Sequence, residues 1–388
     1  MHILSIATLF PDDSRPNFGL FVERSLREAA AQPGVRLSIV APVGVPPWPL
    51  SLHPRYRARA ALPVMQQWNG LTVHRPRFPL IPRFGARFNP AMVARAVLPI
   101  ARRLHAETPI DGIDAQFFFP DGPAAMHVAA ALTLPFIAKA RGADISHWAD
   151  DPMGAPRVAA AASAAARMLA VSEAMKADMV AAGFDGSKIQ VHYTGIDRDR
   201  FCPGDRRAAR AWLAARLGRD IGDAPLIATV GALIARKGQR LVIDALAGLP
   251  GVQYALAGSG EDEAMLRMCA GDAGTGDRVH FLGSVGNADL PMLYRAADAV
   301  VMPSASEGLA NAWVEAIACG TPVVISDAGG ARELVQSEAA GRVVARDPRA
   351  IAVAVRDVIA AGADPDAVAA TLGDRFSWDR NGRELAAH

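Results

Sequence analysis

The chain has 388 residues, of which 51% are hydrophobic and 21% charged. At about 150 residues per domain this length predicts two or three domains, and the hydrophobic content excludes a disordered chain. The chain has 41 lysines and arginines against 39 aspartates and glutamates. This charge is too balanced for a chain that binds nucleic acid over its whole surface. The three cysteines form no CxxC pair, which argues against a disulfide framework or a zinc ribbon and favours a reducing compartment.

The start of the chain, Met1–Phe10, carries no basic segment and no cleavage site of a secretory signal. Apolar stretches elsewhere break before the roughly 18–20 residues that a bilayer span needs, and Lys139 and Arg141 interrupt the longest promising one. We therefore expect a soluble, cytoplasmic protein.

Charge is unevenly placed along the chain. Up to Arg198 there are 21 basic and 15 acidic residues, and no Asp or Glu lies between Ala29 and Ala106. Arginines interleaved with aromatic residues suit anionic lipid headgroups or a phosphorylated partner, so contact with an anionic membrane is one interpretation. The other is a solvated, proline-rich excursion whose arginines reflect genome composition. The residues concerned are Arg36, Arg55, Arg57, Arg59, Arg75, Arg77, Arg83, Arg87, Arg95, Arg102 and Arg103, with Trp48, Trp68, Phe78, Phe84 and Phe88.

In the first half, apolar runs of strand length alternate with helical patterns, which favours parallel βαβ units. We expect helices over Gly19–Ala31, Met92–His105 and Glu173–Ala182, the last capped by Ser172 and stopped by Gly183. The predicted strands are Ile3–Ala7, Arg36–Val40, Leu71–His74, Gly112–Gln116, Phe136–Lys139, Met168–Val171 and Ile189–His192.

A second series of strands follows the segment 194–204, which we interpret as a crossover between two halves. The predicted fold class is therefore α/β, with two Rossmann-like doubly wound domains facing across a cleft that would hold a ligand. The predicted strands of the second half are Leu226–Gly231, Tyr254–Ala257, Val279–Leu282, Asp298–Met302, Pro322–Ile325 and Gly341–Val344.

A loop of small residues, 304–310, follows one of these strands and precedes a helix that we expect to begin near Asn311, a good capping residue. The loop thus lies at the carboxyl end of a strand, where doubly wound folds bind ligands. Backbone N–H groups of Leu309, Ala310 and Asn311 would point out of the helix N-terminus and form a site for phosphate.

Two glutamates flank this phosphate site. Phosphate repels carboxylates, so Glu307 and Glu315 should instead accept hydrogen bonds from sugar or ribose hydroxyls. The alternative is structural: Glu307 favours the helix dipole and Glu315 lies on a solvated helix face.

The turn after the first strand of the second half, residues 230–238, carries two adjacent cations, Arg236 and Lys237. Cations there match a leaving nucleoside diphosphate, whose charge grows as its bond to the sugar breaks. The segment has no GxGxxG fingerprint, and no GxxxxGK[ST] occurs, so dinucleotide-dependent and NTPase chemistry are not indicated. Asp197-Arg198-Asp199 spells DxD, but it falls in the crossover, and we expect no metal site.

The segment Glu307–Glu315 resembles the E-x7-E motif of the family 4 glycosyltransferases ("glycosyl transferases group 1"), which have the two-domain GT-B fold. The resemblance extends along the chain. Further segments that resemble motifs of the family are Gly19-Leu20-Phe21-Val22-Glu23-Arg24, Pro120-Asp121-Gly122, Arg141-Gly142-Ala143-Asp144, Thr194-Gly195-Ile196-Asp197 with Phe201 and Pro203, Gly320-Thr321-Pro322, and Phe376-Ser377-Trp378.

The resemblance implies an acceptor-binding domain over residues 1–198 and a domain binding a nucleotide-sugar donor over 199–376. A C-terminal helix, about 377–388, would pack back on the first domain. The implied activity is that of a retaining hexosyltransferase that needs neither metal nor cofactor. It would move a sugar from a UDP-, GDP- or ADP-sugar to a hydroxyl of a glycan or lipid-linked acceptor, in surface or exopolysaccharide or other glycoconjugate biosynthesis, without nucleic acid.

The resemblance also implies roles for single residues. Glu307 would hold hydroxyls of the donor sugar, Glu315 the ribose and Lys237 the diphosphate, while Gly19 would let backbone amides approach the diphosphate from the other domain. The remaining residues expected to contact the donor are Gly231, Gly308, Leu309, Ala310 and Asn311.

Two positions depart from the family pattern. Ala232 stands where the family usually has an arginine, and Arg236 is the candidate substitute because a guanidinium can reach the same phosphates. Arg141 stands where a histidine is common, so it would either orient the donor or bind an anionic acceptor. Asp144 is a further candidate catalytic residue, and His147 and Asp121 are candidates for acceptor contacts, although ordinary packing also explains a single histidine.

Two other functions fit the same fold. A catalytically silent nucleotide-sugar-binding subunit is the alternative that the two departures suggest. A sugar epimerase or phosphorylase is the other; a phosphorylase would need a pyridoxal-phosphate lysine, and no matching motif surrounds Lys139, Lys176, Lys188 or Lys237.

Overall fold

The computed structural model describes all residues except 17, 81–84, 147, 149 and 150. The chain divides into two compact units, each described here by itself. Unit 1 comprises Met1–Gly195 and Trp378–His388, and unit 2 comprises Ile196–Ser377. The sequence analysis drew these limits after residue 198 and before residue 377.

Unit 1 is built on a sheet in which β1 is central, flanked by β2 on one side and β7 on the other. Its described residues form eight strands in the order β10-β9-β8-β7-β1-β2-β5-β4, parallel throughout except for the antiparallel pair β4–β5. Each strand predicted in this half is present. The strands are β1 (His2–Ile6), β2 (Arg36–Val40), β4 (Met65–Trp68), β5 (Leu71–His74), β7 (Gly112–Ala115), β8 (Phe136–Ala140), β9 (Arg167–Ala170) and β10 (Ile189–Val191).

The helices of unit 1 pack on this sheet through apolar faces. α3 (Gly85–Glu107) starts well before the predicted Met92 and contains Pro90 and Pro99. Ser172 caps α7 as predicted, its side chain accepting from the N–H of Met175 at 3.0 Å. The others are α1 (Leu20–Ala30), α4 (Asp121–Leu132), α5 (Ala143–Ser146), α6 (Ala155–Ala164), α7 (Glu173–Ala181) and α16 (Trp378–Ala387).

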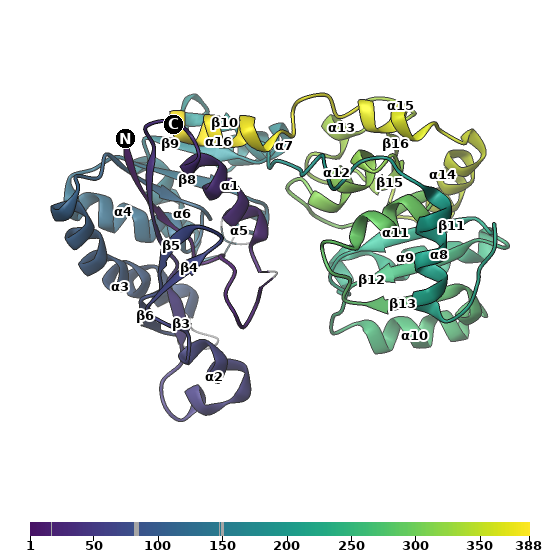
Figure 1. The fold of residues 1–388 in the computed structure, drawn as a ribbon, viewed down its shortest axis with the longest axis horizontal. Coiled ribbons are helices and arrows are strands. Elements are labelled where there is room, and N and C mark those ends of the chain that lie inside the picture. Colours follow the sequence, from purple (N-terminus) through teal and green to yellow (C-terminus); the bar gives the residue numbers. More distant parts are fainter. Residues whose placement is uncertain (17, 81–84, 147, 149–150) are drawn as a thin grey trace. The chain divides into compact units, whose positions relative to one another are not determined.

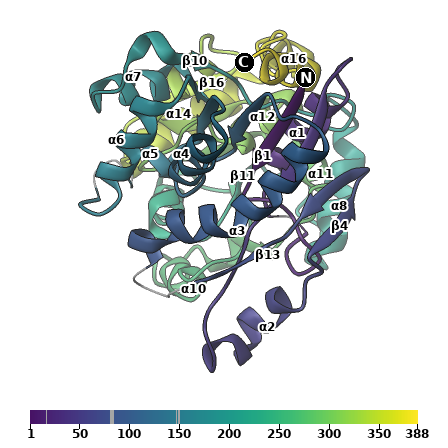
Figure 2. The same cartoon turned by 90° about the vertical axis from the view of Figure 1, so that its left-hand side faces the viewer.

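The acid-free stretch contains elements that the sequence did not predict. β3 (Val43–Val45) pairs with β6 (Arg77–Pro79), and between them lie the short turn η1 (Leu50–Leu52) and α2 (Pro54–Ala60). Figures 1 and 2 show α2 and its flanking loops standing away from the main sheet of this unit.

Unit 2 is a doubly wound parallel sheet. Its described residues form six strands in the order β13-β12-β11-β14-β15-β16, and every strand predicted in this half is present. The six strands are β11 (Leu226–Val230), β12 (Gln253–Ala257), β13 (Val279–Gly283), β14 (Ala299–Met302), β15 (Val323–Ser326) and β16 (Gly341–Val344). The inner strands β11, β12, β14 and β15 are almost entirely buried, which explains their nearly continuous apolar sequences.

The helices that connect successive strands of unit 2 are α9 (Gln239–Ala245), α10 (Glu263–Asp272), α11 (Leu290–Ala296), α12 (Asn311–Ala318) and α13 (Ala331–Leu334). The helix α8 (Arg206–Leu217) precedes the first strand, and α14 (Pro348–Ala361) and α15 (Pro365–Ala370) follow the last.

Candidate functional site

The strand order of unit 2 reverses between β11 and β14. Loops that follow neighbouring strands at such a reversal diverge and leave room for a ligand at the carboxyl edge of the sheet. The loop after β11 carries Arg236 and Lys237, and the loop after β14 carries Glu307. The two segments singled out in the sequence therefore meet at the place where this fold binds ligands.

The side chains of these loops are in contact. Nζ of Lys237 donates to Oε1 of Glu307 at 2.5 Å, and both side chains are largely buried. Nη1 of Arg236 lies 3.5 Å from the same carboxylate oxygen and donates to the carbonyl of Ser306. The stem of Lys237 passes beside Gly231. An ammonium has three donors, so Lys237 can hold Glu307 and still offer N–H groups to a phosphate.

Gly329 packs against the backbone of the Glu307 loop, a contact that no sequence motif indicated. It has a left-handed backbone (φ +50), and a Cβ there would lie 2.2 Å from the carbonyl oxygen of Glu307 and 2.3 Å from that of Gly308. The N–H of Gly330 donates to the carbonyl of Gly308 at 2.8 Å. Only glycine fits this approach, so the pair Gly329-Gly330 fixes where the Glu307 loop lies.

Helix α12 begins at Asn311, but its capping residue is Ala310 rather than the predicted Asn311. No side chain among the described residues caps this helix end, because alanine carries no acceptor. The uncapped end, preceded by Gly308 and Leu309, leaves N–H groups that an anion can accept from.

Glu315 projects from α12 towards α11. Its Oε2 accepts a hydrogen bond from the hydroxyl of Tyr294 at 2.8 Å. Burial raises the pKa of Glu315 to about 7, although the tyrosine hydrogen bond acts in the opposite direction. The structural alternative of a fully solvated helix face therefore does not describe this residue.

Arg141 of unit 1 lies at the carboxyl end of β8 and is held by Gln116. Its Nε donates to the Gln116 carbonyl at 2.7 Å and its Nη2 to Oε1 of the Gln116 amide at 2.6 Å, while its guanidinium lies 4.9 Å from the ring centre of Phe21. Burial lowers the pKa of Arg141 to about 10, so the side chain stays cationic at neutral pH. Nη1 has no hydrogen-bond partner within the described part of the chain.

A buried carboxylate sets the orientation of that glutamine. Nε2 of Gln116 donates to Oδ2 of Asp114 at 2.5 Å, and the Ser5 hydroxyl donates to the same oxygen at 2.9 Å. Because the amide nitrogen faces Asp114, the amide oxygen must face Arg141. Sequence analysis assigned Asp114 and Gln116 no role, since neither belongs to a recognisable motif.

The predicted roles of Asp144 and Asp121 need correction. Neither side chain has exposed surface. Asp144 accepts backbone N–H bonds from Phe118, Arg141 and Gly142, and Asp121 accepts from the N–H of Thr8. Both carboxylates hold loops at the carboxyl edge of the sheet, so they position the site rather than contact a substrate hydroxyl.

Two further predicted residues remain to be placed. Gly19 directly precedes α1 and lies against the carbonyl of Leu9. His147 lies outside the described residues, and its role in acceptor binding stays a prediction.

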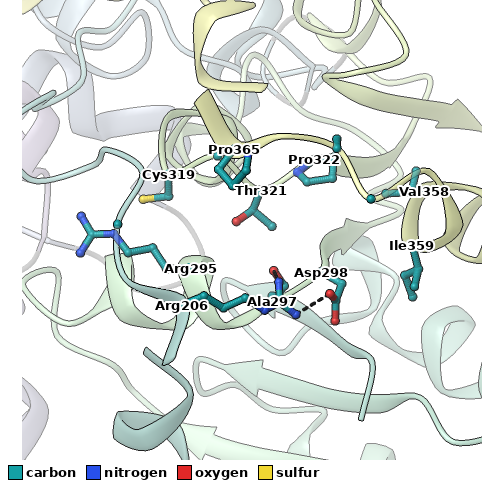
Figure 3. A pocket seen from close by; sticks show the side chains of 14 residues that line it. Arg206, Arg295, Ala297, Asp298, Cys319, Thr321, Pro322, Val358, Ile359 and Pro365 are labelled. Carbon is teal, nitrogen blue, oxygen red and sulfur yellow. Dashed lines mark hydrogen bonds and ion pairs between the residues drawn. The ribbon is translucent and has the colours of Figure 1, made fainter. Parts of the chain in front are cut away.

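A separate cavity of about 280 Å³ opens at the opposite edge of the unit 2 sheet (Figure 3). Its lining includes Ala297 and Asp298, which directly precede β14, and Pro322, which directly precedes β15. Its cations are already engaged: Arg206 pairs with Asp298 at 2.5 Å, and Arg295 donates to the carbonyl of Cys202 at 2.9 Å. This cavity therefore does not belong to the candidate site.

Among the described residues, no group of three or more His, Cys, Asp or Glu side chains is arranged to hold a metal ion. Over the same residues, no helix combines the length and apolar character of a bilayer span.

Known proteins resemble both halves of the chain. The model of "Glycosyltransferase Family 4" matches residues 22–200, and that of "Glycosyl transferases group 1" matches residues 218–370. D-inositol 3-phosphate glycosyltransferase of Mycobacterium avium (strain 104) is 36% identical over 213 residues, which cover 52% of this chain and 49% of that protein. The same-named protein of Mycobacterium tuberculosis (strain F11) is 40% identical over 168 residues, covering 42% and 34% respectively. The match thus spans half or less of these relatives.

Solved structures align over the whole chain. HepE of Anabaena in complex with UDP aligns with a TM-score of 0.74 at 21% identity, covering 100% of this chain and 99% of that one. Sucrose-phosphate synthase of Thermosynechococcus elongatus aligns with a TM-score of 0.76 at 22% identity, covering 100% and 98%.

The two doubly wound units and these alignments define the fold class as GT-B, as the sequence predicted. With one family model matching each half, the chain belongs to the family 4 glycosyltransferases of the group 1 type.

Proposed function

We propose that this chain is a retaining, metal-independent glycosyltransferase that moves a hexosyl group from a nucleoside-diphosphate sugar to an acceptor hydroxyl. The observation that carries the proposal is the contact between Lys237 and Glu307 at the strand-order reversal of unit 2. Lys237 carries the positive charge that binds a diphosphate, and Glu307 accepts hydrogen bonds from sugar hydroxyls.

The chemistry follows from the leaving group. As the bond between the anomeric carbon and the diphosphate breaks, negative charge grows on the phosphate oxygens, and Lys237, Arg236 and the uncapped end of α12 stabilise it. A diphosphate is a weak base and needs no proton from an acid. Glu307 holds donor-sugar hydroxyls and faces the positive charge that develops on the sugar, so its contacts accelerate transfer where they tighten in the transition state.

Unit 1 supplies acceptor binding in this proposal. Nη1 of Arg141, which has no partner among the described residues, belongs to a guanidinium held in place by Gln116 and is a fixed donor for a hydroxyl or an anionic group. The relatives named D-inositol 3-phosphate glycosyltransferase and the aligned structure of WaaG, "a glycosyltransferase involved in lipopolysaccharide biosynthesis", support a role in surface or exopolysaccharide or other glycoconjugate assembly. We propose the cytoplasm as the place of this activity.

A transfer assay tests the proposal. The purified chain is screened by thermal shift with UDP, GDP and ADP, and sugars of the stabilising nucleotide are then offered with a panel of glycan and lipid-linked acceptors. We expect turnover that persists in EDTA, a product with the anomeric configuration of the donor, and loss of transfer in Glu307→Ala. The control Glu338→Gln changes an exposed carboxylate that precedes β16, at the edge of the sheet opposite the site, and should transfer normally. Nucleotide binding without turnover on any acceptor would favour the silent binding subunit.

We further propose that unit 1 contacts an anionic membrane through residues 46–65, the membrane segment. This segment exposes large apolar side chains: Trp48 is 78% exposed, Leu52 63% and Val64 69%. Leu50 and Met65 are exposed as well. Large apolar residues gathered in one excursion of the chain are typical of interaction surfaces rather than of a solvated loop.

Charge complementarity supports a lipid partner. The membrane segment lies within the acid-free stretch, and Arg57 on α2 is exposed. Two residues that the sequence grouped with this surface do not belong to it: Arg75 and Phe78 are buried, and Arg75 donates to the carbonyl of Pro11. The side chains of Arg55 and Arg87 and the residues Arg83 and Phe84 lie outside what the structure describes.

Vesicle sedimentation tests the membrane proposal. We expect binding to anionic vesicles at low salt, weaker binding to neutral ones, and a clear loss in Trp48→Ser/Leu52→Ser. Met268→Ser, which removes an exposed apolar side chain from α10, serves as the control and should bind normally. Equal binding of both variants, or none by the wild type, would exclude this surface.

A further inference from the structure

Tyr294 on α11 has no exposed surface, and its hydroxyl donates to Oε2 of Glu315 on α12. When Glu315 is ionised its oxygens only accept, so the tyrosine hydroxyl is the donor. A hydrogen bond to a charged acceptor in a buried place is stronger than one between neutral groups. No sequence motif marks this tyrosine, since its partner lies on another helix, 21 residues further along the chain.

The tyrosine is itself fixed on two sides. The Thr321 hydroxyl, just past α12, donates to the Tyr294 carbonyl at 2.7 Å. The ring of Phe201 packs against the Tyr294 ring, with centres 6.3 Å apart. One hydrogen bond thus joins α11 to α12 and a second joins α11 to the segment that follows α12, so the tyrosine hydroxyl has little freedom to follow a moving carboxylate.

The other carboxylate oxygen of Glu315 is in a different situation. Within the described residues Oε1 has no hydrogen-bond partner, and it is not among the buried atoms that lack one. One oxygen of Glu315 is thus held by the protein, and the other is left accessible to an incoming donor group.

We propose that Tyr294 is a positioning residue for the nucleotide: it holds one oxygen of Glu315 so that the other is presented to a ribose hydroxyl. This inference rests on the proposed function and on the ribose contact that the family resemblance implies for Glu315. On this proposal, Tyr294 and Glu315 together discriminate between ribose and deoxyribose, rather than Glu315 alone.

Removing the hydroxyl should change two measurable properties. Without it Glu315 gains rotamer freedom, so a ribose contact costs more entropy to form. The pKa of Glu315, already raised to about 7 by burial, rises further because the hydrogen bond that lowers it is gone. Since the ionised carboxylate is the better acceptor, the preference for ribose should then develop at higher pH.

The experiment compares a ribonucleotide with its 2′-deoxy form. The probe is whichever of UDP, GDP and ADP stabilises the chain most, and calorimetric titration gives Kd for both forms between about pH 5.5 and about pH 8.5. The ratio of the two Kd values cancels the titration of the phosphates. In Tyr294→Phe we expect the ribonucleotide to bind about three- to tenfold more weakly with the deoxynucleotide little changed. The ratio of the deoxynucleotide Kd to the ribonucleotide Kd should rise as Glu315 ionises, and in Tyr294→Phe we expect this rise at higher pH than in the wild type.

A matched control and a second probe keep the test decisive. Tyr254→Phe removes another fully buried hydroxyl of unit 2, one bonded to Thr229 at 2.8 Å, and should leave the ratio unchanged. If Tyr294→Phe does not fold, the wild-type sequence is produced with 3-fluorotyrosine. Its more acidic hydroxyl is a stronger donor and should move the pH midpoint of the ratio downwards.

The outcomes separate this inference from the proposed function. If Glu315→Gln abolishes ribose preference but Tyr294→Phe, or 3-fluorotyrosine, leaves the ratio and its midpoint as in the wild type, the positioning role is wrong and the proposed function stands. If Glu315→Gln also keeps the preference, the ribose role of Glu315 is wrong, and the inference fails with it. If no nucleoside diphosphate binds, both the proposed function and the inference are overturned.

Discussion

At the scale of single residues, Gln116 shows how a side chain outside any motif can control one that a motif marks. Its amide joins Asp114 to Arg141, with donor and acceptor ends fixed by those partners. We predict that Gln116→Leu lowers transfer about tenfold or more, because Arg141 loses a charge-assisted bond and its fixed orientation. The readout is kcat and KM for donor and acceptor. Gln116→Glu, which keeps an acceptor for Arg141, should recover part of the activity, and equal rates for wild type and Gln116→Leu would contradict this positioning.

Asp121 gives a prediction for pH-dependent stability. Burial raises its pKa from 3.8 to about 7, so the folded chain keeps a proton there that the unfolded chain loses. Stability should therefore fall as pH rises from about 4 to about 7. In Asp121→Asn this contribution disappears. Over that pH range we expect the free energy of unfolding of the variant to fall by on the order of 1 to 3 kcal/mol less than that of the wild type. Urea unfolding at several pH values measures it, with the exposed Asp272→Asn as control. Parallel curves for wild type and Asp121→Asn would refute the protonated state.

The residues that the sequence predicted and those that it missed differ in kind. Lys237 and Glu307 lie in loops next to strands, where residue type and position along the chain indicate chemistry. Tyr294, Gln116 and Asp114 act through partners on other elements, and those partners come together only in the folded chain. Asp144 was misassigned for the same reason: its backbone partners at the carboxyl edge of the sheet cannot be inferred from residue type.

At the scale of elements, alternation of apolar runs was sufficient for the parallel strands of both main sheets, because buried parallel strands are nearly continuously apolar. The alternation missed β4, an antiparallel edge strand of unit 1 in which every second residue is exposed. It was insufficient for β3, β6 and α2, which are short and lie in a proline-rich stretch. The cap of α12 was misplaced by one residue, because Asn311 has a good capping side chain while the chain turns at Ala310.

The contact of Gly329 with the Glu307 loop is an element-scale prediction. In Gly329→Ala the new methyl group would meet the carbonyls of Glu307 and Gly308, so the loop must move. We expect donor-sugar affinity to fall about tenfold or more, beyond the roughly 1 kcal/mol stability cost of alanine in a left-handed conformation. Gly274→Ala is the matched control, since Gly274 also has positive φ (+64) but no atom within 4 Å of its added Cβ. The same loss of affinity in both variants would show that loop position is not the cause.

At the scale of the whole molecule, the last helix returns to unit 1. Asn381 of α16 is buried, accepts from the Ser25 hydroxyl at 2.6 Å and donates to the Tyr193 carbonyl at 2.6 Å. We predict that Asn381→Ala destabilises unit 1 by about 2 kcal/mol, because buried partners are left unsatisfied. Hydrogen exchange in α1 and α16 resolves the effect, with the exposed Asp379→Ala as control. Unchanged protection in Asn381→Ala would contradict this role.

The central claim is that unit 2 holds a sugar diphosphate with Lys237 on the phosphates and Glu307 on the sugar. Calorimetric titration of the stabilising nucleoside diphosphate and of its sugar, with wild type, Lys237→Ala and Glu307→Gln, tests it most directly. We predict that Lys237→Ala weakens both ligands, whereas Glu307→Gln weakens the sugar nucleotide alone and leaves the free nucleotide bound at least as tightly, because Lys237 is released from its ion pair. Equal loss of both ligands in Glu307→Gln, or no loss in either variant, would contradict the account.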